Sequence, residues 1–331
     1  MNRIGINGFG RIGRCLTRIA LAENGIDIAL INDITDIATL AHLLKYDSIH
    51  GILNLQFTIE GNTLHFENGK KIIFTQEKDP SQIPWGDYSV ETVIECTGIF
   101  LTREAAGKHL KNTVKRVILS APATDADIQT VVLGVNDSNI NLSDTIFSNA
   151  SCTTNNAAPM IKVLKELVKI DVAYISTIHS YTSDQRLHDS PHRDLRRARA
   201  AANSIIPTST GAAKAITKIF PDLDGKITGG SVRVPVLDGS MTEMTIITKD
   251  EVSVAQINAA MKNAALGSLK GILGYTEDPI VSVDVIGSSY SCLFDADLTV
   301  VFNNLIKVVG WYDNEAGYSH RLLDFAKKFN S

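Results

Sequence analysis

The chain has 331 residues, of which 44% are hydrophobic and 21% are charged, and its formal net charge is −4. This is the composition of an ordinary soluble protein with room for two domains, and its slightly acidic balance excludes a general attraction to nucleic acid or to anionic membranes. The first residues lack the apolar core of a signal peptide, and no apolar run is long enough to span a bilayer, so we expect a cytoplasmic protein without a membrane partner.

The first half of the chain alternates short β-branched runs with amphipathic segments. Strands are predicted for residues 3–7, 26–32, 90–97, 116–121 and 145–148, and helices for residues 12–23 and 39–44. This alternation predicts an α/β fold with a mostly parallel, doubly wound sheet, the dinucleotide-binding (Rossmann) architecture.

The second half changes character near Ala150. A long amphipathic segment at residues 157–168 is followed by predicted strands at 172–179, 231–236 and 241–248 and a predicted helix at 255–266. We therefore expect a dinucleotide-binding domain over residues 1–150 and an α+β catalytic domain over 151–315. A final helix at 316–331 is expected to pack back on the first domain.

A glycine motif follows the first predicted strand and opens the first predicted helix. Gly8 permits a tight turn, Gly10 lets the backbone approach a pyrophosphate, and Gly13 allows helix and strand to pack closely. Asp33 stands at the end of the second predicted strand, where a carboxylate accepts hydrogen bonds from ribose hydroxyls and repels a 2′-phosphate. The motif indicates NAD in preference to NADP; the alternative is that these residues form ordinary turns.

The four cysteines are widely separated and include no Cys-x-x-Cys pair, so neither a metal site nor a disulfide framework is predicted. Cys15, Cys96 and Cys292 lie in apolar patterns typical of small buried residues. Cys152 differs, because small polar residues surround it in the segment 148–155, between a strand and the amphipathic helix. A helix start there favours thiolate over thiol, although Pro159 leaves open a helix that begins only at that position.

His179 is the expected base for this cysteine. A helix from Cys152 to about residue 168 runs roughly 25 Å outward, and a strand over residues 171–179 returns roughly 30 Å. The imidazole can then meet the thiol, forming a thiolate–imidazolium pair and shuttling a proton.

Basic residues crowd the stretch between His179 and Gly211. Their guanidinium groups, with the hydroxyl of Thr210 and the backbone of Gly211, could hold phosphate; a solvated face or a contact with a neighbouring subunit are the alternatives. Arg233 lies opposite valines on a predicted strand and suits either a ligand pocket or solvent.

Five segments, at residues 6–14, 148–155, 193–202, 207–214 and 311–315, resemble the glyceraldehyde-3-phosphate dehydrogenase family across both domains. The resemblance implies a phosphorylating oxidation of glyceraldehyde 3-phosphate to 1,3-bisphosphoglycerate in glycolysis or gluconeogenesis, with reduction of NAD. Cys152 would form a hemithioacetal and then a thioester that inorganic phosphate cleaves, His179 acting as base. The family's usual assembly is a homotetramer.

The resemblance also assigns binding residues. Substrate phosphate would contact Thr182 and Arg233, and inorganic phosphate the anion-binding group that comprises Ser151, Thr153, Arg197, Thr210 and Gly211. Beyond the glycines and Asp33, the cofactor would contact Arg11, Ile12, Lys78, Ser120 and Asn314.

The chain departs from the family pattern at three positions. Asn156 stands where a second cysteine is common, Ala316 replaces a tryptophan near the nicotinamide end, and Ser190 replaces a leucine before Pro191. The smaller residue at 190 could admit a 2′-phosphate, so use of NADP stays open. Alternative functions are a phosphorylating dehydrogenase for another aldehyde phosphate, such as erythrose 4-phosphate, an amino-acid semialdehyde dehydrogenase, and a redox-sensing module.

Overall fold

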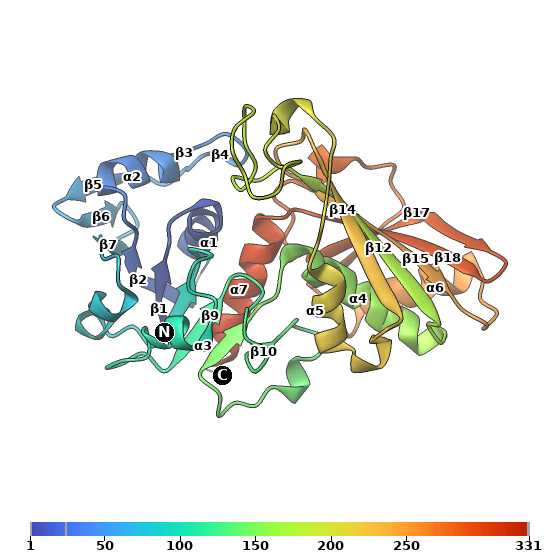
Figure 1. The fold of residues 1–331 in the computed structure, drawn as a ribbon. Coiled ribbons are helices and arrows are strands. Elements are labelled where there is room, and N and C mark those ends of the chain that lie inside the picture. Colours follow the sequence, from blue (N-terminus) through green and yellow to red (C-terminus); the bar gives the residue numbers. More distant parts are fainter. Residues whose placement is uncertain (1, 24, 330–331) are drawn as a thin grey trace. The chain divides into compact units, whose positions relative to one another are not determined.

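The computed structural model describes residues 2–23 and 25–329, which divide into two compact units (Figure 1). Apart from residue 24, the first unit contains residues 2–131, 139–150 and 319–329, and the second contains residues 132–138 and 151–318. Residues 330 and 331, the end of the predicted C-terminal helix, lie outside the described part. None of the helices in the described ranges is long and apolar enough to cross a membrane.

The first unit is built on a sheet that, within the described residues, has nine strands in the order β10-β11-β9-β8-β1-β2-β7-β6-β5. Seven of them pair in parallel: β1 (Asn2–Asn7), β2 (Ile26–Asn32), β7 (Lys71–Thr75), β8 (Thr92–Glu95), β9 (Arg116–Leu119), β10 (Gln129–Thr130) and β11 (Ile146–Ser148). The strand order reverses at β1, whose neighbours are β2 and β8. This reversal is the topological switch point at which doubly wound sheets bind ligands.

Helices connect these strands. The helix α1 (Arg11–Ala22) contacts both β2 and the next helix, α2 (Ile37–Lys45). The short helix α3 (Arg103–Gly107) contacts β9 and β11. Side-chain caps fix two of the helix starts, since Asp36 accepts from the Thr39 N–H and Thr102 from the Ala105 N–H. The doubly wound parallel sheet predicted from the sequence is confirmed.

An antiparallel edge extends this sheet beyond β7, and the sequence analysis missed it. It consists of β5 (Phe57–Glu60) and β6 (Thr63–Phe66), each joined to the next strand by a turn with a positive-φ glycine, Gly61 or Gly69. Asn68 followed by Gly69 was the available signal, because this dipeptide favours hairpin turns. A further small ribbon pairs β3 (Tyr46–Asp47) with β4 (Gly51–Ile52).

The second unit has a mixed sheet in the order β13-β14-β12-β15-β18-β17-β16, counting described strands only. Its members are β12 (Val172–Ser180), β13 (Ile206–Thr208), β14 (Ile227–Val234), β15 (Ser240–Ile247), β16 (Leu273–Thr276), β17 (Cys292–Phe302) and β18 (Leu305–Tyr312). The helices α4 (Cys152–Leu167), α5 (Ala212–Ile219) and α6 (Val254–Leu266) contact strands of this sheet (Figure 1). The α+β class predicted for the second domain is confirmed.

The predicted helix from Cys152 to about residue 168 is confirmed as α4, and its alternative start at Pro159 is wrong. Pro159 lies in the helix interior, because the Ser151 cap fixes the start five residues before the amphipathic pattern becomes clear. Other predicted boundaries differ from the structure. Strand β14 begins four residues earlier than expected and ends before Pro235, which has no N–H to donate. The long hairpin of β17 and β18 was not predicted.

The last helix, α7 (Ala316–Lys328), places its C-terminal part in the first unit. There the rings of Phe325 and Phe329 lie 5.8 and 5.0 Å from the ring of Phe147 on β11. Both contacts are in the favourable range for aromatic pairs, so Phe325 of α7 belongs to the core of the unit and Phe329, just after the helix, packs against it.

Candidate active site

The proposed nucleophile is the first residue of helix α4. Ser151 caps the helix, and its hydroxyl accepts a hydrogen bond from the Thr154 N–H at 3.1 Å. Ala150 just before it has φ 56°, a left-handed conformation that is uncommon outside glycine. This sharp turn and the cap set Cys152 at the positive end of the helix dipole.

His179 lies where the predicted return of the strand placed it. It is the penultimate residue of β12, and its Nε2 is 3.5 Å from Cys152 Sγ. Its Nδ1 is 2.7 Å from the carbonyl oxygen of Ser180. A carbonyl only accepts, so this contact favours the tautomer that carries the proton on Nδ1 and leaves the Nε2 lone pair facing the thiol.

Arg233 completes the site from the neighbouring strand. β12 and β14 pair in parallel, with His179 in register with Arg233, and Arg233 Nη1 lies 3.0 Å from both His179 Nδ1 and the Ser180 carbonyl. With the proton on His179 Nδ1, the Ser180 carbonyl is the acceptor of the Arg233 hydrogen bond. Its Nε is buried and has no hydrogen-bond partner among the described residues. A half-buried guanidinium with a donor to spare is suited to an anion. The sequence left open whether Arg233 lies in a ligand pocket or in solvent, and the structure favours the ligand pocket.

The electrostatics favour a neutral thiol and a neutral imidazole at pH 7. Burial raises the pKa of Cys152 to about 11, against the opposing effects of Arg233 and of hydrogen bonds from Thr153. Burial and the Arg233 charge lower the pKa of His179 to about 3. His179 is therefore a free base near neutrality, able to take the thiol proton as sulfur attacks. The thiolate–imidazolium pair suggested by the sequence is the less favoured form here.

Tyr312 is a component of the site that the sequence analysis did not identify. It ends β18, is fully buried, and its hydroxyl lies 2.9 Å from Thr153 Oγ1. Its ring meets the edge of His179, with centroids 5.9 Å apart. Thr153, expected to contact phosphate, thus has its hydroxyl engaged inside the unit. Nothing in the local sequence pattern distinguished Tyr312 from an ordinary core residue.

The expected phosphate-binding residues differ in how available they are. Arg197 is held by an ion pair with Asp184 and by a 2.9 Å hydrogen bond to Thr208 Oγ1. Gly211 caps α5 without a side chain, and a Cβ built there would meet nothing within 4 Å. The backbone at Gly211 is therefore open to an anion, whereas Arg197 is already paired with a carboxylate.

Thr182 and Thr210 lie at the two ends of the basic stretch. Both are half-buried; the Thr182 N–H donates to Gln185 Oε1 at 3.3 Å, and Thr210 Oγ1 accepts from the Ala212 N–H at 3.2 Å. Neither contact uses the hydroxyl hydrogen, so both side chains can still donate to a phosphate oxygen.

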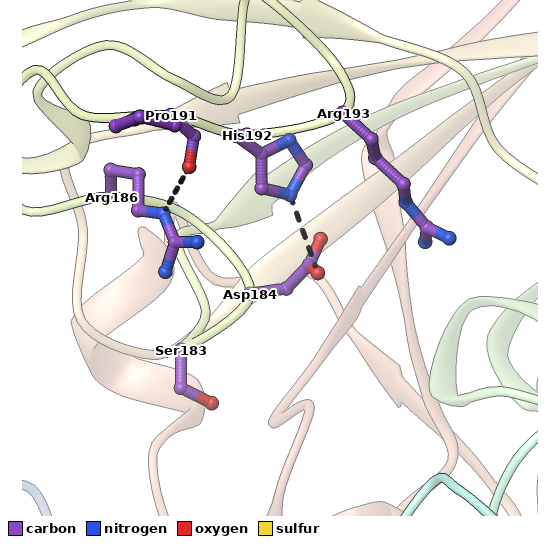
Figure 2. A pocket seen from close by; sticks show the side chains of 6 residues that line it. All are labelled: Ser183, Asp184, Arg186, Pro191, His192 and Arg193. Carbon is purple, nitrogen blue, oxygen red and sulfur yellow. Dashed lines mark hydrogen bonds and ion pairs between the residues drawn. The ribbon is translucent and has the colours of Figure 1, made fainter.

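The basic stretch between them forms an open pocket of about 570 Å³, shown in Figure 2. His192 Nε2 faces Asp184 at 3.6 Å, and Arg186 Nε donates to the carbonyl of Pro191 at 3.0 Å. The pocket is lined by Ser183, Asp184, Arg186, Pro191, His192 and Arg193. Cys152 is not among them, so this pocket is a separate feature of the second unit.

The glycine motif of the first unit has the geometry that a dinucleotide requires. Gly8 has φ +94°, and a Cβ there would lie 2.8 Å from Thr97 N; a Cβ at Gly13 would lie 2.3 Å from the Gly8 carbonyl. A Cβ at Gly10 would meet nothing within 4 Å, and α1 has no side-chain cap. The helix N-terminus is therefore open, and the backbone N–H groups of Arg11 and Ile12 in its first turn are placed to bind a pyrophosphate.

Asp33 is oriented beside this motif. Its Oδ2 accepts from the Phe9 N–H at 2.7 Å and its Oδ1 from the Thr35 N–H at 2.9 Å, which fixes the carboxylate against the glycine turn. Arg11 is paired through its side chain with Asp47, at 2.5 and 3.1 Å. A direct side-chain contact of Arg11 with a cofactor would have to share the guanidinium with that carboxylate.

The remaining expected cofactor residues lie in both units. Lys78 is exposed after β7, and Ser120 follows β9 with its N–H bonded to the Glu95 carbonyl. In the second unit Asn314 Oδ1 accepts from Ser180 Oγ at 2.8 Å and Ser240 Oγ at 2.7 Å. These hydroxyls fix the orientation of the Asn314 amide, leaving its NH₂ group as the donor.

Two of the three departures from the family pattern are accommodated in the structure. Asn156 is buried and donates to the Trp311 carbonyl at 3.2 Å, and Ala316 is buried at the start of α7. Ser190 is exposed.

A Rossmann-type unit followed by a unit that holds a half-buried cysteine, a buried histidine and a half-buried arginine together defines a dinucleotide-dependent dehydrogenase that works through a thiol. Comparison with known proteins specifies the family. Residues 2–103 match the model described as "Glyceraldehyde 3-phosphate dehydrogenase, NAD binding domain", and residues 151–314 match the corresponding C-terminal domain.

Curated relatives agree over the whole chain. It is 52% identical to glyceraldehyde-3-phosphate dehydrogenase 1 of Bacillus cereus, covering 100% of this chain and 99% of that protein. It is also 52% identical to glyceraldehyde-3-phosphate dehydrogenase of Geobacillus stearothermophilus and 49% identical to glyceraldehyde-3-phosphate dehydrogenase 1 of Bacillus subtilis strain 168, covering 98% of this chain and 97% of each relative. The chain belongs to the glyceraldehyde-3-phosphate dehydrogenase family, as its sequence motifs predicted.

Proposed function

We propose that this protein oxidises glyceraldehyde 3-phosphate to 1,3-bisphosphoglycerate with NAD and inorganic phosphate, using Cys152 as nucleophile and His179 as base. The observation that carries the proposal is the 3.5 Å contact between Cys152 Sγ and Nε2 of a neutral His179, beside the half-buried Arg233. We assign residues 1–150 to cofactor binding, with the C-terminal helix, and residues 151–315 to catalysis.

The reaction begins when sulfur attacks the aldehyde carbon. A bond forms between Sγ and that carbon, His179 takes the thiol proton and returns it to the new oxyanion, and a hemithioacetal results. The backbone N–H of Cys152 and the His179 Nε2–H donate to this oxygen while it carries negative charge, as an oxyanion hole does.

Oxidation and release use the same base. His179 removes the hydroxyl proton of the hemithioacetal as hydride leaves the carbon, so that a thioester remains on Cys152. NAD, when bound, supplies the acceptor for that hydride. Inorganic phosphate then attacks the thioester carbon, the C–S bond breaks, and protonated His179 returns its proton to the departing sulfur.

Two anion positions serve this chemistry. Thr182 and Arg233 bind the phosphate of the aldehyde, Arg233 through the guanidinium hydrogens that its hydrogen bond to the Ser180 carbonyl leaves over. The attacking phosphate is bound by Ser151, Thr210 and Gly211, with Arg197 contributing positive charge nearby.

The further assignments are a preference for NAD, a cytoplasmic location and a homotetrameric assembly. The Asp33 carboxylate supports the first, and four free cysteines are compatible with a reducing compartment. Exposed apolar side chains in the basic stretch, including Leu187, Leu195 and Ile205, support contact with further copies of the chain. Light scattering coupled to size exclusion measures that assembly.

The test is the initial rate of NADH formation from glyceraldehyde 3-phosphate, with and without inorganic phosphate and with NADP in place of NAD. Phosphate-dependent turnover that Cys152→Ser abolishes and Cys15→Ala preserves would support the proposal. Turnover of erythrose 4-phosphate in preference to glyceraldehyde 3-phosphate would overturn the substrate assignment, and a wild-type-like rate for Cys152→Ser would overturn the mechanism.

A further inference from the structure

A fully buried carboxylate and imidazole lie together in the first unit, outside the catalytic residues described above. Glu95 ends β8, and its Oε2 is 3.0 Å from His109 Nε2; both side chains have no exposed surface. Trp85 Nε1 lies 3.1 Å from His109 Nδ1. An indole N–H only donates, so Nδ1 is the acceptor, and His109 is a neutral imidazole that donates from Nε2 to Glu95.

Three further donors converge on the same carboxylate. Asn7 Nδ2 donates to Oε2 at 2.7 Å, the Thr97 N–H donates to Oε1 at 2.8 Å, and the Thr97 hydroxyl donates to Oε1 as well. Three of these groups are N–H groups that can only donate, and an ionised carboxylate accepts from all three and from the Thr97 hydroxyl. A glutamine at this position would turn its NH₂ group toward at least one of these N–H donors.

The network continues across the ends of the neighbouring strands. Asn7 Oδ1 accepts from Asn32 Nδ2 at 2.8 Å, and Asn32 Oδ1 accepts from Thr75 Oγ1 at 2.9 Å and from the Glu77 N–H at 2.8 Å. These residues lie at or just beyond the carboxyl ends of β8, β1, β2 and β7, which are adjacent in the sheet. One hydrogen-bonded chain therefore spans four parallel strands at the edge where such sheets bind nucleotides.

The members of this chain adjoin the residues that would hold the cofactor. Asn7 immediately precedes Gly8, and Asn32 immediately precedes Asp33. The backbone at Cys96 and Thr97 is the surface that Gly8 touches, since a Cβ on Gly8 would lie 2.8 Å from Thr97 N and 2.9 Å from the Cys96 carbonyl carbon. We therefore expect a shift of the Glu95 carboxylate to displace both the Gly8 turn and the strand end that carries Asp33.

We propose that Glu95 is a positioning residue for the dinucleotide, locking the Gly8 turn, the Asp33 strand end and the Thr97 segment into one cofactor-binding arrangement; this inference rests on the proposed use of NAD. Burying a charge among neutral donors costs free energy that an apolar core would avoid. The Glu95 charge fixes the geometry at the cofactor-binding edge of the sheet, because its hydrogen-bond donors can all be satisfied in a single arrangement.

The experiment compares full-length wild type with Glu95→Gln. We expect the Kd for NAD, from calorimetric titration, and the KM for NAD to rise about ten-fold, since hydrogen bonds to a buried charge are lost. The kcat at saturating NAD should fall by less than about three-fold, and Cys152 alkylation by iodoacetamide without cofactor should keep its wild-type rate. Glu91→Gln is the matched control, because Glu91 is a half-buried glutamate whose ion pair among the described residues is with Lys115.

Second variants keep the test independent of folding. Thr97→Val removes one donor to Glu95 without changing size and should raise the Kd for NAD about three-fold. His109→Leu should raise it more than His109→Gln, which retains both an acceptor for Trp85 and a donor for Glu95. If Thr97→Val and a folded Glu95→Gln both bound NAD with the wild-type Kd, the inference would be overturned. A wild-type protein that binds no NAD would instead refute the proposed function.

Discussion

Deleting Nε2 of His179 is the most direct perturbation of the proposed chemistry. His179→Asn keeps a polar group near the Nδ1 position, so the contacts with the Ser180 carbonyl and Arg233 can persist. It removes the atom that lies 3.5 Å from Cys152 Sγ. The thiol then has to ionise without a base at hydrogen-bond distance.

The expected magnitude follows from the thiol itself. With a pKa of about 11, a thiol that ionises alone is thiolate in only about one molecule in 10⁴ at pH 7. General base catalysis by a positioned side chain typically contributes about 10²–10⁴ in rate. We therefore expect kcat/KM at pH 7 to fall by about 10³ to 10⁴, and the rate to increase about ten-fold for each pH unit between 7 and 9.

The assay is initial NADH formation across pH 6 to 9, together with the rate of Cys152 alkylation by iodoacetamide over the same range. Wild type should show a much flatter profile than the variant, because His179 stays unprotonated well above its pKa of about 3. The control His65→Asn changes a half-buried histidine of the first unit and should behave as wild type. If His179→Asn retained more than about a tenth of the activity with a flat profile, His179 would not be the base.

Three further predictions concern selectivity, charge and stability. Asp33→Ser removes a carboxylate that repels a 2′-phosphate, so the ratio of the Kd values for NAD and NADP should shift about ten-fold or more toward NADP. Calorimetric titration measures both Kd values, and an unchanged ratio would count against this role of Asp33. Arg233→Met should raise the pKa of Cys152, seen as an upward shift in the pH profile of alkylation, since the Arg233 charge lowers that pKa. Because the pKa of His179 falls from 6.5 to about 3 on folding, the unfolded chain binds more protons between those values; stability in urea should therefore fall as pH drops from about 6.5 toward 3, and His179→Asn should reduce that fall.

The sequence by itself determined the parts of this protein that depend on short spacings. Gly8, Gly10 and Gly13 lie in one strand–turn–helix unit, and Asp33 ends the next strand, so their chemistry is set by residues close in the chain. The approach of His179 to Cys152 was also predictable, because a helix and the strand that follows it usually run antiparallel over similar lengths.

The tertiary structure decided everything that depends on pairing between distant segments. Arg233 meets His179 only through the register of β14 on β12, and Tyr312 reaches Thr153 from a strand 159 residues away. The four-strand network centred on Glu95 likewise joins side chains whose own segments look like ordinary strand ends. Periodicity identifies which face of an element is buried, but register and strand order come from long-range packing, and the local sequence does not encode them.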